Sequence, residues 1–201
     1  MKSLYLIVCL SLFLTACGTA GTGTGVTTSA LPKLDVKVGG KSSTLDVKSG
    51  VVDLSEMVAT APGKPDVKTF LHKIYLANFE MDTNGSAWMN KPLTAPEQMR
   101  VEIHLLGENG TNKDSPFKVG TYAAQADKTS GVRTVKILTF EGGKQTDASF
   151  NSLMGYSDKK AAGEVKISSV TADTVSGEVD LTEGDKSIKG NFTAKLPAAK
   201  K

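Results

Sequence analysis

Cysteine is almost absent from this chain of 201 residues, which contains only Cys9 and Cys17. Because both lie close to the N-terminus, the rest of the chain has no disulfide framework, no thiol nucleophile and no cysteine-ligated metal site. The chain is nevertheless long enough to bury a stable core without cross-links of this kind.

An excess of charge of one sign is missing as well. The sequence has 24 Lys and Arg against 21 Asp and Glu, a net charge of +3, and neither sign forms a block. Nucleic-acid binding usually requires a basic patch or a basic helix, and binding to anionic lipid requires a polybasic segment. We therefore expect no nucleic-acid partner and interpret the scattered lysines as solvated positions.

Long apolar runs are missing except at the N-terminus, where residues 4–14 are almost entirely apolar and follow Lys2. This run is too short to span a membrane, which takes about 20 apolar residues. A positive start, a short apolar core and small residues before a cleavage site make up a secretory signal peptide. Thr15 and Ala16 are the small residues here, and Cys17 follows directly.

The four residues Leu14, Thr15, Ala16 and Cys17 resemble the lipobox of bacterial lipoproteins. The resemblance implies cleavage after Ala16 and a diacylglycerol thioether on the Cys17 sulfur, usually with an acyl chain such as palmitate on its amine. Two or more acyl chains hold a protein stably at a bilayer. Since Gly18 follows in place of an Asp, the resemblance favours the outer membrane over the inner one. The alternative is an ordinary secretory signal with a coincidental cysteine.

The composition divides the chain into four segments. Residues 1–16 are the expected signal peptide, and residues 17–33 are the lipidated cysteine with a Gly/Thr-rich tether that has almost no large side chain. Such a tether reaches about 20–25 Å. Residues 34–196 form the expected β domain, and residues 197–201 form a short tail.

Most of the expected domain alternates apolar and polar residues with the two-residue period of half-buried strands. Residues 69–81 differ, because apolar side chains fall on both parities, which predicts a central strand covered on both faces. The predicted strands are 34–38, 45–48, 51–58 (or a short helical turn), 69–81, 100–106, 117–122, 132–140, 165–168, 175–181 and 187–196.

About eight to ten short strands in one domain predict an all-β fold. We expect an antiparallel β-sandwich of the Ig-like, Greek-key kind, because the loops are unequal in length; a closed β-barrel is the alternative. Gly39-Gly40 predicts a tight turn. No segment of ten or more residues has a clean helical period, although residues 93–99 and 144–154 have room for a helical turn.

Short motifs near the C-terminus carry a second resemblance. Residues 120–122, 163–170, 175–178 and 190–192 are similar to the "GTY", "GxVxI(S/T)" and closing "GxF" strands of small bacterial lipoprotein β-sandwich domains of unknown function. This similarity covers residues 117–196. It implies a fold and an envelope location, and it brings no activity or ligand with it.

Metal chemistry has few candidates in this sequence. His72 and His104 are the only histidines, and on neighbouring strands they could bind a metal together with Glu102. No third ligand stands at motif spacing, so we expect no resident metal and no cofactor. Residues 82–86 begin like a calcium loop but lack its later acidic ligands, which favours an Asx turn at Asn84-Gly85.

The longest predicted loop, residues 82–99, contains Trp88, the only tryptophan, followed by Met89. Long loops in compact domains are often functional, and an exposed aromatic side chain can bind a ligand or a partner. The alternative is that Trp88 folds back and covers one end of the sandwich.

No catalytic signature is present: the sequence has no Ser-His-Asp order, no nucleophile elbow and no phosphate-binding glycine loop, since residues 18–25 lack the Lys-Ser/Thr of a P-loop. We expect a non-enzymatic lipoprotein that serves envelope structure or binds an envelope protein partner. The alternatives are a binding domain for a small ligand or glycan and an enzyme with an unrecognised site. A lined cavity would favour ligand binding, and convergent polar groups around a buried carboxylate or histidine would favour an enzyme.

Overall fold

The computed structural model describes residues 31–59, 67–85, 88–107, 117–124, 131–154 and 160–197. The lipobox with Cys17, the tether up to residue 30 and the Pro62–Pro65 segment lie outside the described residues. Among those that are described, no helix is long and apolar enough to cross a bilayer.

The described part of the chain contains eleven strands and two short 3-10 helices, so the all-β prediction is confirmed and the expected eight to ten strands were too few. The elements are β1 (Lys33–Val38), β2 (Lys41–Asp46), β3 (Ser49–Ala59), β4 (Val67–Ala77), η1 (Trp88–Asn90), β5 (Met99–Leu106), β6 (Gly120–Ala123), β7 (Gly131–Glu141), β8 (Lys144–Ser149), η2 (Asn151–Met154), β9 (Ala162–Val170), β10 (Thr174–Glu183) and β11 (Lys186–Lys195).

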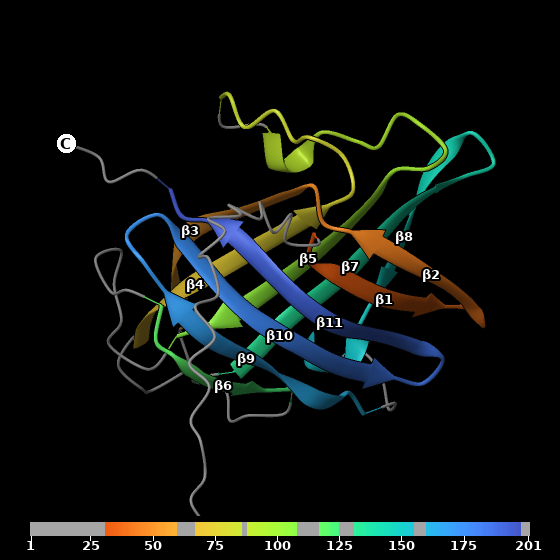
Figure 1. Ribbon diagram of the computed structural model, residues 1–201. Helices are drawn as coiled ribbons and strands as arrows, with labels where there is room; N and C mark the ends of the chain where they lie inside the picture. Colours follow the sequence, from red (N-terminus) through yellow and green to blue (C-terminus); the bar gives the residue numbers. More distant parts are fainter. Residues whose placement is uncertain are drawn as a thin grey trace, which may run out of the picture. The chain divides into compact units, whose positions relative to one another are not determined.

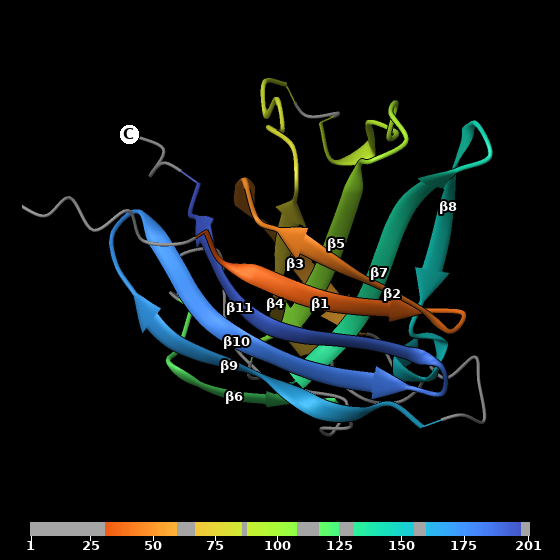
Figure 2. The ribbon, with the colours of Figure 1, turned by 45° about the vertical axis from the view of Figure 1, so that its right-hand side comes forward.

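All these strands belong to one sheet with the order β6-β9-β10-β11-β3-β4-β5-β7-β8, and the β1–β2 hairpin joins it through β11. Neighbouring strands are antiparallel except β11 and β3, which meet in parallel at Lys195 and Val51. Gly50 permits this approach, because a Cβ at that position would lie 2.2 Å from the Thr193 carbonyl oxygen. Figures 1 and 2 show β9, β10 and β11 crossing over β4, β5 and β7.

The sheet does not close into a barrel in the described residues, so that alternative is wrong. β6 pairs only with β9 and β8 pairs only with β7, which leaves one edge of each strand without a ladder partner among the described strands. Two physical features explain this. β6 has only four residues, and β8 (KQTDAS) is a polar strand of the kind that commonly ends a sheet.

One apolar core takes side chains from both parts of the sheet. The alternation predicted for the C-terminal third is confirmed, since Val179, Leu181, Ile188 and Phe192 are buried while Glu178, Asp180, Lys189 and Asn191 are exposed. The same core takes in the inward side chains of β4, β5 and β7 from the other half, such as Ile103. The strand predicted over residues 69–81 ends at Ala77, and up to that point its coverage on both faces is confirmed, because Tyr75 and Ala77 are buried on the face away from the core.

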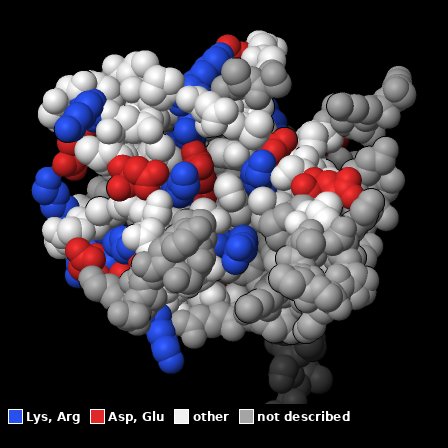
Figure 3. All heavy atoms as spheres, turned by 180° about the vertical axis from the view of Figure 1, so that it is seen from behind, with Lys and Arg blue, Asp and Glu red and all other residues white. Residues whose placement is uncertain are grey.

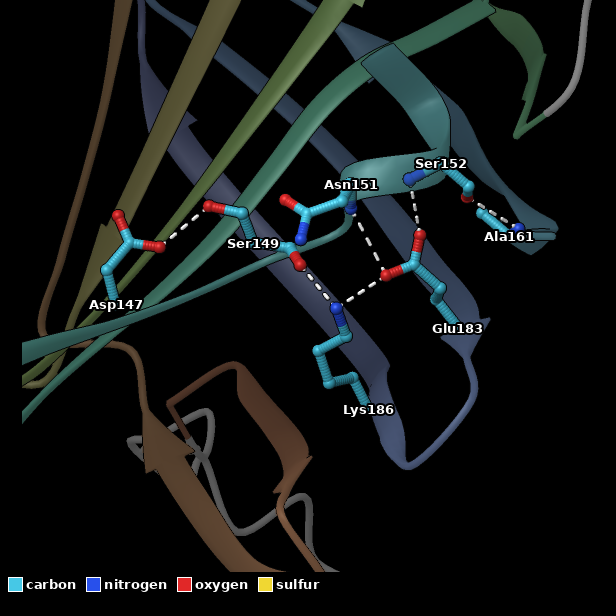
Figure 4. Close-up of polar contacts among 7 residues, drawn as sticks. All are labelled: Asp147, Ser149, Asn151, Ser152, Ala161, Glu183 and Lys186. Carbon is cyan, nitrogen blue, oxygen red and sulfur yellow. Dashed lines mark hydrogen bonds and ion pairs between the residues drawn. The ribbon is translucent and has the colours of Figure 1, made fainter. Parts of the chain in front are cut away.

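A polar cluster joins the two halves of the sheet, as Figure 4 shows. The carboxylate of Glu183, at the end of β10, accepts hydrogen bonds from the backbone nitrogens of Asn151 (3.2 Å) and Ser152 (2.7 Å), where η2 begins. Lys186 pairs with Glu183 and donates to the carbonyl oxygen of Ser149. Glu183 therefore occupies an inward, buried position that the strand alternation assigns to an apolar residue.

Several local predictions need correction or are resolved. Residues 51–58 are strand, not a helical turn, and Gly39 and Gly40 both have positive φ at the predicted turn. Residues 144–149 are strand, and the helical turn comes only at η2. Residues 93–99 contain a turn and no helix, and the strand expected over 117–122 begins only at Gly120.

Candidate functional site

A cavity of about 420 Å³ lies on the face of β4, β5, β7 and β8 that points away from the core. Residues of the loop between β4 and β5 contribute to one wall. The lining residues are Lys73, Tyr75, Met89, Asn90, Arg100, Glu102, His104, Lys136, Leu138, Gln145 and Asp147. The volume falls within the range of about 300–1,000 Å³ that is typical of small-molecule sites.

Strand register brings the polar lining residues together. Tyr75 pairs with Glu102, and Glu102 pairs with Lys136 on the next strand. In the next row on the same face, Lys73 pairs with His104. In the row on the other side of Glu102, Arg100 pairs with Leu138, and Leu138 pairs with Asp147. Because side chains alternate between the faces of a strand, all these residues project from the same face.

Arg100 and Glu102 form a buried ion pair at the centre of this face, with 4% and 8% of their surfaces exposed. Nε and Nη2 of Arg100 lie 3.0 and 2.9 Å from the same Glu102 oxygen, Oε1. Nη1 of Arg100 donates to the carbonyl oxygen of Lys91 at 3.1 Å. No described residue donates a hydrogen bond to Glu102 Oε2, so this atom is available to a ligand.

Burial dominates the electrostatics of the two central groups. It raises the pKa of Glu102, an effect that the charges of Arg100 and Lys136 only partly offset. Burial also raises the pKa of Tyr75 well above its ordinary value, and the Glu102 and Asp53 carboxylates add to this effect. The Tyr75 hydroxyl is therefore protonated at neutral pH.

Two further ion pairs flank the centre. Lys73 Nζ lies 3.3 Å from Asp53 Oδ2, and Lys136 Nζ lies 3.8 Å from Asp147 Oδ2. Every lysine and arginine that lines the cavity thus has a carboxylate partner nearby, and the net charge of the site is small.

His104 lines the same cavity, and its imidazole is uncharged at neutral pH. Burial lowers the pKa of its imidazole to about 4, and the positive charges of Lys73 and Lys136 act in the same direction. Its Nε2 atom is buried and has no hydrogen-bond partner among the described residues. A buried nitrogen without a partner costs free energy, and because Nε2 has almost no accessible surface, a ligand in the cavity does not contact this atom directly.

The two-histidine metal site is wrong, because β4 and β5 present the two imidazoles on opposite faces. His72 pairs across the strands with Leu105, not with His104, and points into the core. Its ring centroid lies 4.1 Å from that of Phe117 and 5.9 Å from that of Phe70. The described residues contain no group of three or more His, Cys, Asp or Glu that could hold a metal ion.

The loop between β4 and β5 covers part of the outer face, and Trp88 belongs to it. The half-buried Trp88 ring packs edge-to-face on Tyr75 with centroids 4.9 Å apart, and Met89 lines the cavity. Trp88 therefore folds back onto the outer face of the sheet and supports a wall of the cavity. Gln145 Oε1 anchors the loop by accepting from the Leu93 backbone nitrogen at 2.9 Å.

The predicted Asx turn exists, but a different side chain forms it. Asp82 Oδ1 accepts hydrogen bonds from the backbone nitrogen of Asn84 (3.1 Å) and from its side-chain Nδ2 (2.8 Å). Lys91 Nζ contacts the other oxygen of Asp82 at 2.7 Å. The Asp82 carboxylate is thus occupied in holding the loop that carries Trp88 and Met89.

A second concave surface, of about 390 Å³, lies on the outer face of β9, β10 and β11. Its lining includes Glu178, Asp180 and Lys189. The Asp180 and Lys189 side chains pair at 2.7 Å but remain 57% and 71% exposed. This surface has the character of a solvated sheet face, and the buried groups described above distinguish the first cavity from it.

Most of this site was missed at the level of sequence. Only Met89, Glu102 and His104 had been singled out, the last two for a metal. The sequence did contain one usable signal. Residues 69–81 have apolar side chains on both faces of the strand, so another segment must cover Tyr75 on the outer face. That segment must also cover the polar residues that lie beside Tyr75 on the next strand.

On the side turned away in Figure 1, acidic and basic side chains are interspersed over the described surface (Figure 3).

No family model matches this chain, and neither a curated protein sequence nor a solved structure matches it.

Proposed function

We propose that this chain is a lipid-anchored protein of the bacterial envelope whose β domain binds a small ligand in the cavity over β4, β5, β7 and β8. One observation carries the proposal: a buried Arg100–Glu102 pair faces a cavity of about 420 Å³ with one carboxylate oxygen unused by the described residues. Few convergent polar groups in a concave site are typical of ligand binding.

The cavity favours ligand binding over the structural or protein-interaction role that the sequence suggested first. A buried ion pair adds little to stability compared with apolar residues of the same volume. Three charged or titratable residues in a row on β5, Arg100, Glu102 and His104, are therefore better explained by recognition than by packing.

Binding is also favoured over catalysis, although the site contains a buried carboxylate and a histidine. Arg100 holds Glu102 Oε1 through two contacts, and its charge partly offsets the rise in the Glu102 pKa that burial causes. Covalent catalysis typically uses a nucleophile and a base within hydrogen-bond distance of each other, and the described residues that line the cavity show no such pair. We therefore assign Glu102 the role of a hydrogen-bond acceptor for a ligand.

The anchor and the location rest on residues 1–17. We propose cleavage after Ala16, acylation of Cys17 and an outer-membrane location, with the tether 17–33 holding the domain off the bilayer. The position of the first described strand, which begins at Lys33, is compatible with such a tether.

We also propose that the fold is a sandwich made from one continuous sheet. The single apolar core that takes side chains from β9, β10 and β11 and from β4, β5 and β7 supports this description. The Glu183 cluster supports it as well, because it ties the end of β10 to β8 and η2.

Fluorescence of Trp88 tests the binding proposal, since this only tryptophan packs on the cavity-lining Tyr75. The full chain in detergent is titrated with glucose, galactose, mannose, glycine, glutamine, citrate and phosphate. We expect a saturable change in emission with at least one compound, which E102Q weakens and E178Q, on the exposed face of β10, leaves unchanged. No saturable change with any compound, or the same change in E102Q, would overturn the proposal.

A further inference from the structure

The chemical character of the ligand can be inferred from how the cavity distributes its charges. This inference rests on the proposed function and names the class of ligand that the cavity binds. We propose that the cavity binds a neutral polyhydroxylated compound, a sugar ring, through Glu102 Oε2, Lys136 and Gln145, with the ring against Met89.

The charges that line the cavity are balanced, so the cavity has no strong preference for an anionic or a cationic ligand. Lys73, Arg100 and Lys136 each lie 2.9–3.8 Å from a carboxylate oxygen. An anionic ligand must compete with these carboxylates for the same cations, and it meets Glu102 and Asp147 in the cavity itself. A cationic ligand is repelled by the three basic residues and must compete with them for the carboxylates. A neutral ligand leaves all three ion pairs in place.

His104 contributes to this balance. Because its imidazole is neutral above about pH 4, it adds no fourth positive charge beside Lys73 and Lys136. A neutral imidazole nitrogen either donates or accepts a hydrogen bond, depending on the tautomer. The imidazole therefore adds a neutral polar group, and no charge, to the lining of the cavity.

The available hydrogen-bonding groups are of both kinds, and this mixture matches hydroxyl groups. Glu102 Oε2 is an acceptor only, and the Lys136 ammonium is a donor only. The Gln145 carbonyl oxygen already accepts from Leu93, which leaves its amide NH2 as a donor. Each hydroxyl group of a sugar both donates and accepts, so one ring can pair with all three residues at once.

Apolar groups complete the site. Tyr75, Met89 and Leu138 belong to the lining of the same cavity, and Met89, which is only half-buried, offers contact for the C–H groups of a ring. The Tyr75 ring is fixed by its edge-to-face contact with Trp88 at 4.9 Å.

The test compares sugars that share a ring and differ in charge. Isothermal titration of the full chain in detergent uses glucose, galactose and mannose, each with its amino sugar and its uronic acid. We expect at least one neutral sugar to bind, and its two charged derivatives to bind about tenfold more weakly or worse, the effect of one uncompensated charge.

The variants are E102Q and Lys136→Gln, which remove a charge at different positions in the cavity, with E178Q as the matched control. Both cavity variants should weaken binding of the neutral sugar about tenfold, as loss of one charged hydrogen bond does. Thermal unfolding shows whether each variant folds. If one of them does not fold, the binding result of the other variant decides whether the sugar assignment holds.

The outcomes separate the inference from the proposed function. Tighter binding of a uronic acid, an amino sugar, glycine, glutamine, citrate or phosphate in this cavity overturns the sugar assignment and leaves ligand binding intact. Failure of every compound in both titrations overturns ligand binding and the sugar assignment with it.

Discussion

Glu183 Oε1 lies 2.7 Å from the backbone nitrogen of Ser152, a residue 31 positions earlier in the chain. The other carboxylate oxygen accepts from Asn151, and Lys186 neutralises the charge. This contact joins the end of β10 to the start of η2 and so holds two distant parts of the sheet together (Figure 4).

Glu183→Gln should destabilise the domain by about 2 kcal/mol or more, because it leaves Lys186 without its partner and weakens two hydrogen bonds to a charged group. Urea unfolding measures the difference, with E178Q on the same strand as the exposed control. A loss no larger than that of the control would show that the contact does not stabilise the fold.

The same contact predicts a pH dependence. Burial tends to raise the pKa of Glu183, but hydrogen bonds from Lys186 and Ser152 outweigh it, and the pKa lies below its ordinary value. The unfolded carboxyl therefore takes up its proton first as the pH falls. The stability difference between the wild type and Glu183→Gln should be full above about pH 5 and shrink below about pH 4, near the ordinary glutamate pKa and lower.

Arg100→Met should be more damaging than removal of the whole Arg100–Glu102 pair. The single change leaves a buried carboxylate without its partner, which costs about 3–5 kcal/mol, whereas the double change Arg100→Met/Glu102→Met recovers most of that loss. Since the pKa of Glu102 rises further without Arg100, the single variant should lose stability as the pH rises from about 4 to neutral. Equal losses in the single and double variants would contradict the pairing.

His104 should titrate near pH 4 in the folded protein, and NMR of the two histidines measures this directly. In the unfolded chain the imidazole takes up a proton at about pH 6.5. The wild type should therefore lose stability as the pH falls from 6.5 towards 4, by up to about 3 kcal/mol at 1.36 kcal/mol per pKa unit. His104→Gln should abolish this component, and a titration midpoint near 6.5 would show that the imidazole is solvated.

Cys17→Ala tests the proposed anchor. Without the thiol there is no acylation site, so we expect an unprocessed precursor or a soluble protein in place of a membrane-bound mature form. Cell fractionation and mass spectrometry of the N-terminus measure the outcome. Mature, processed Cys17→Ala protein in the membrane pellet would contradict lipid anchoring through this residue.

Local patterns were sufficient for the strands and their faces. Val179 and Leu181 lie inward because the two-residue period leaves one consistent register, and Gly39-Gly40 forms its turn because both residues adopt positive φ. Glu183 broke the pattern, since its hydrogen-bond partners come from a distant segment that local alternation does not reveal.

Long-range pairing was not predictable from the sequence alone. The pairing of Leu34 with Gly190 joins the two ends of the domain, and nothing in either strand specifies the other. The cavity depends on the same kind of information. Glu102 and Lys136 become neighbours only once β5 and β7 are paired in register.

The most direct test of ligand binding is the NMR signal of His104, because this residue lines the cavity. The full chain, labelled on histidine, is titrated with glucose, galactose and mannose at neutral pH, and His72 in the core serves as the internal control. We predict that at least one sugar shifts the His104 ring signals saturably and leaves those of His72 unchanged. If none of the three sugars moves the His104 signals, or if both histidines shift alike, binding of a sugar at this cavity is contradicted.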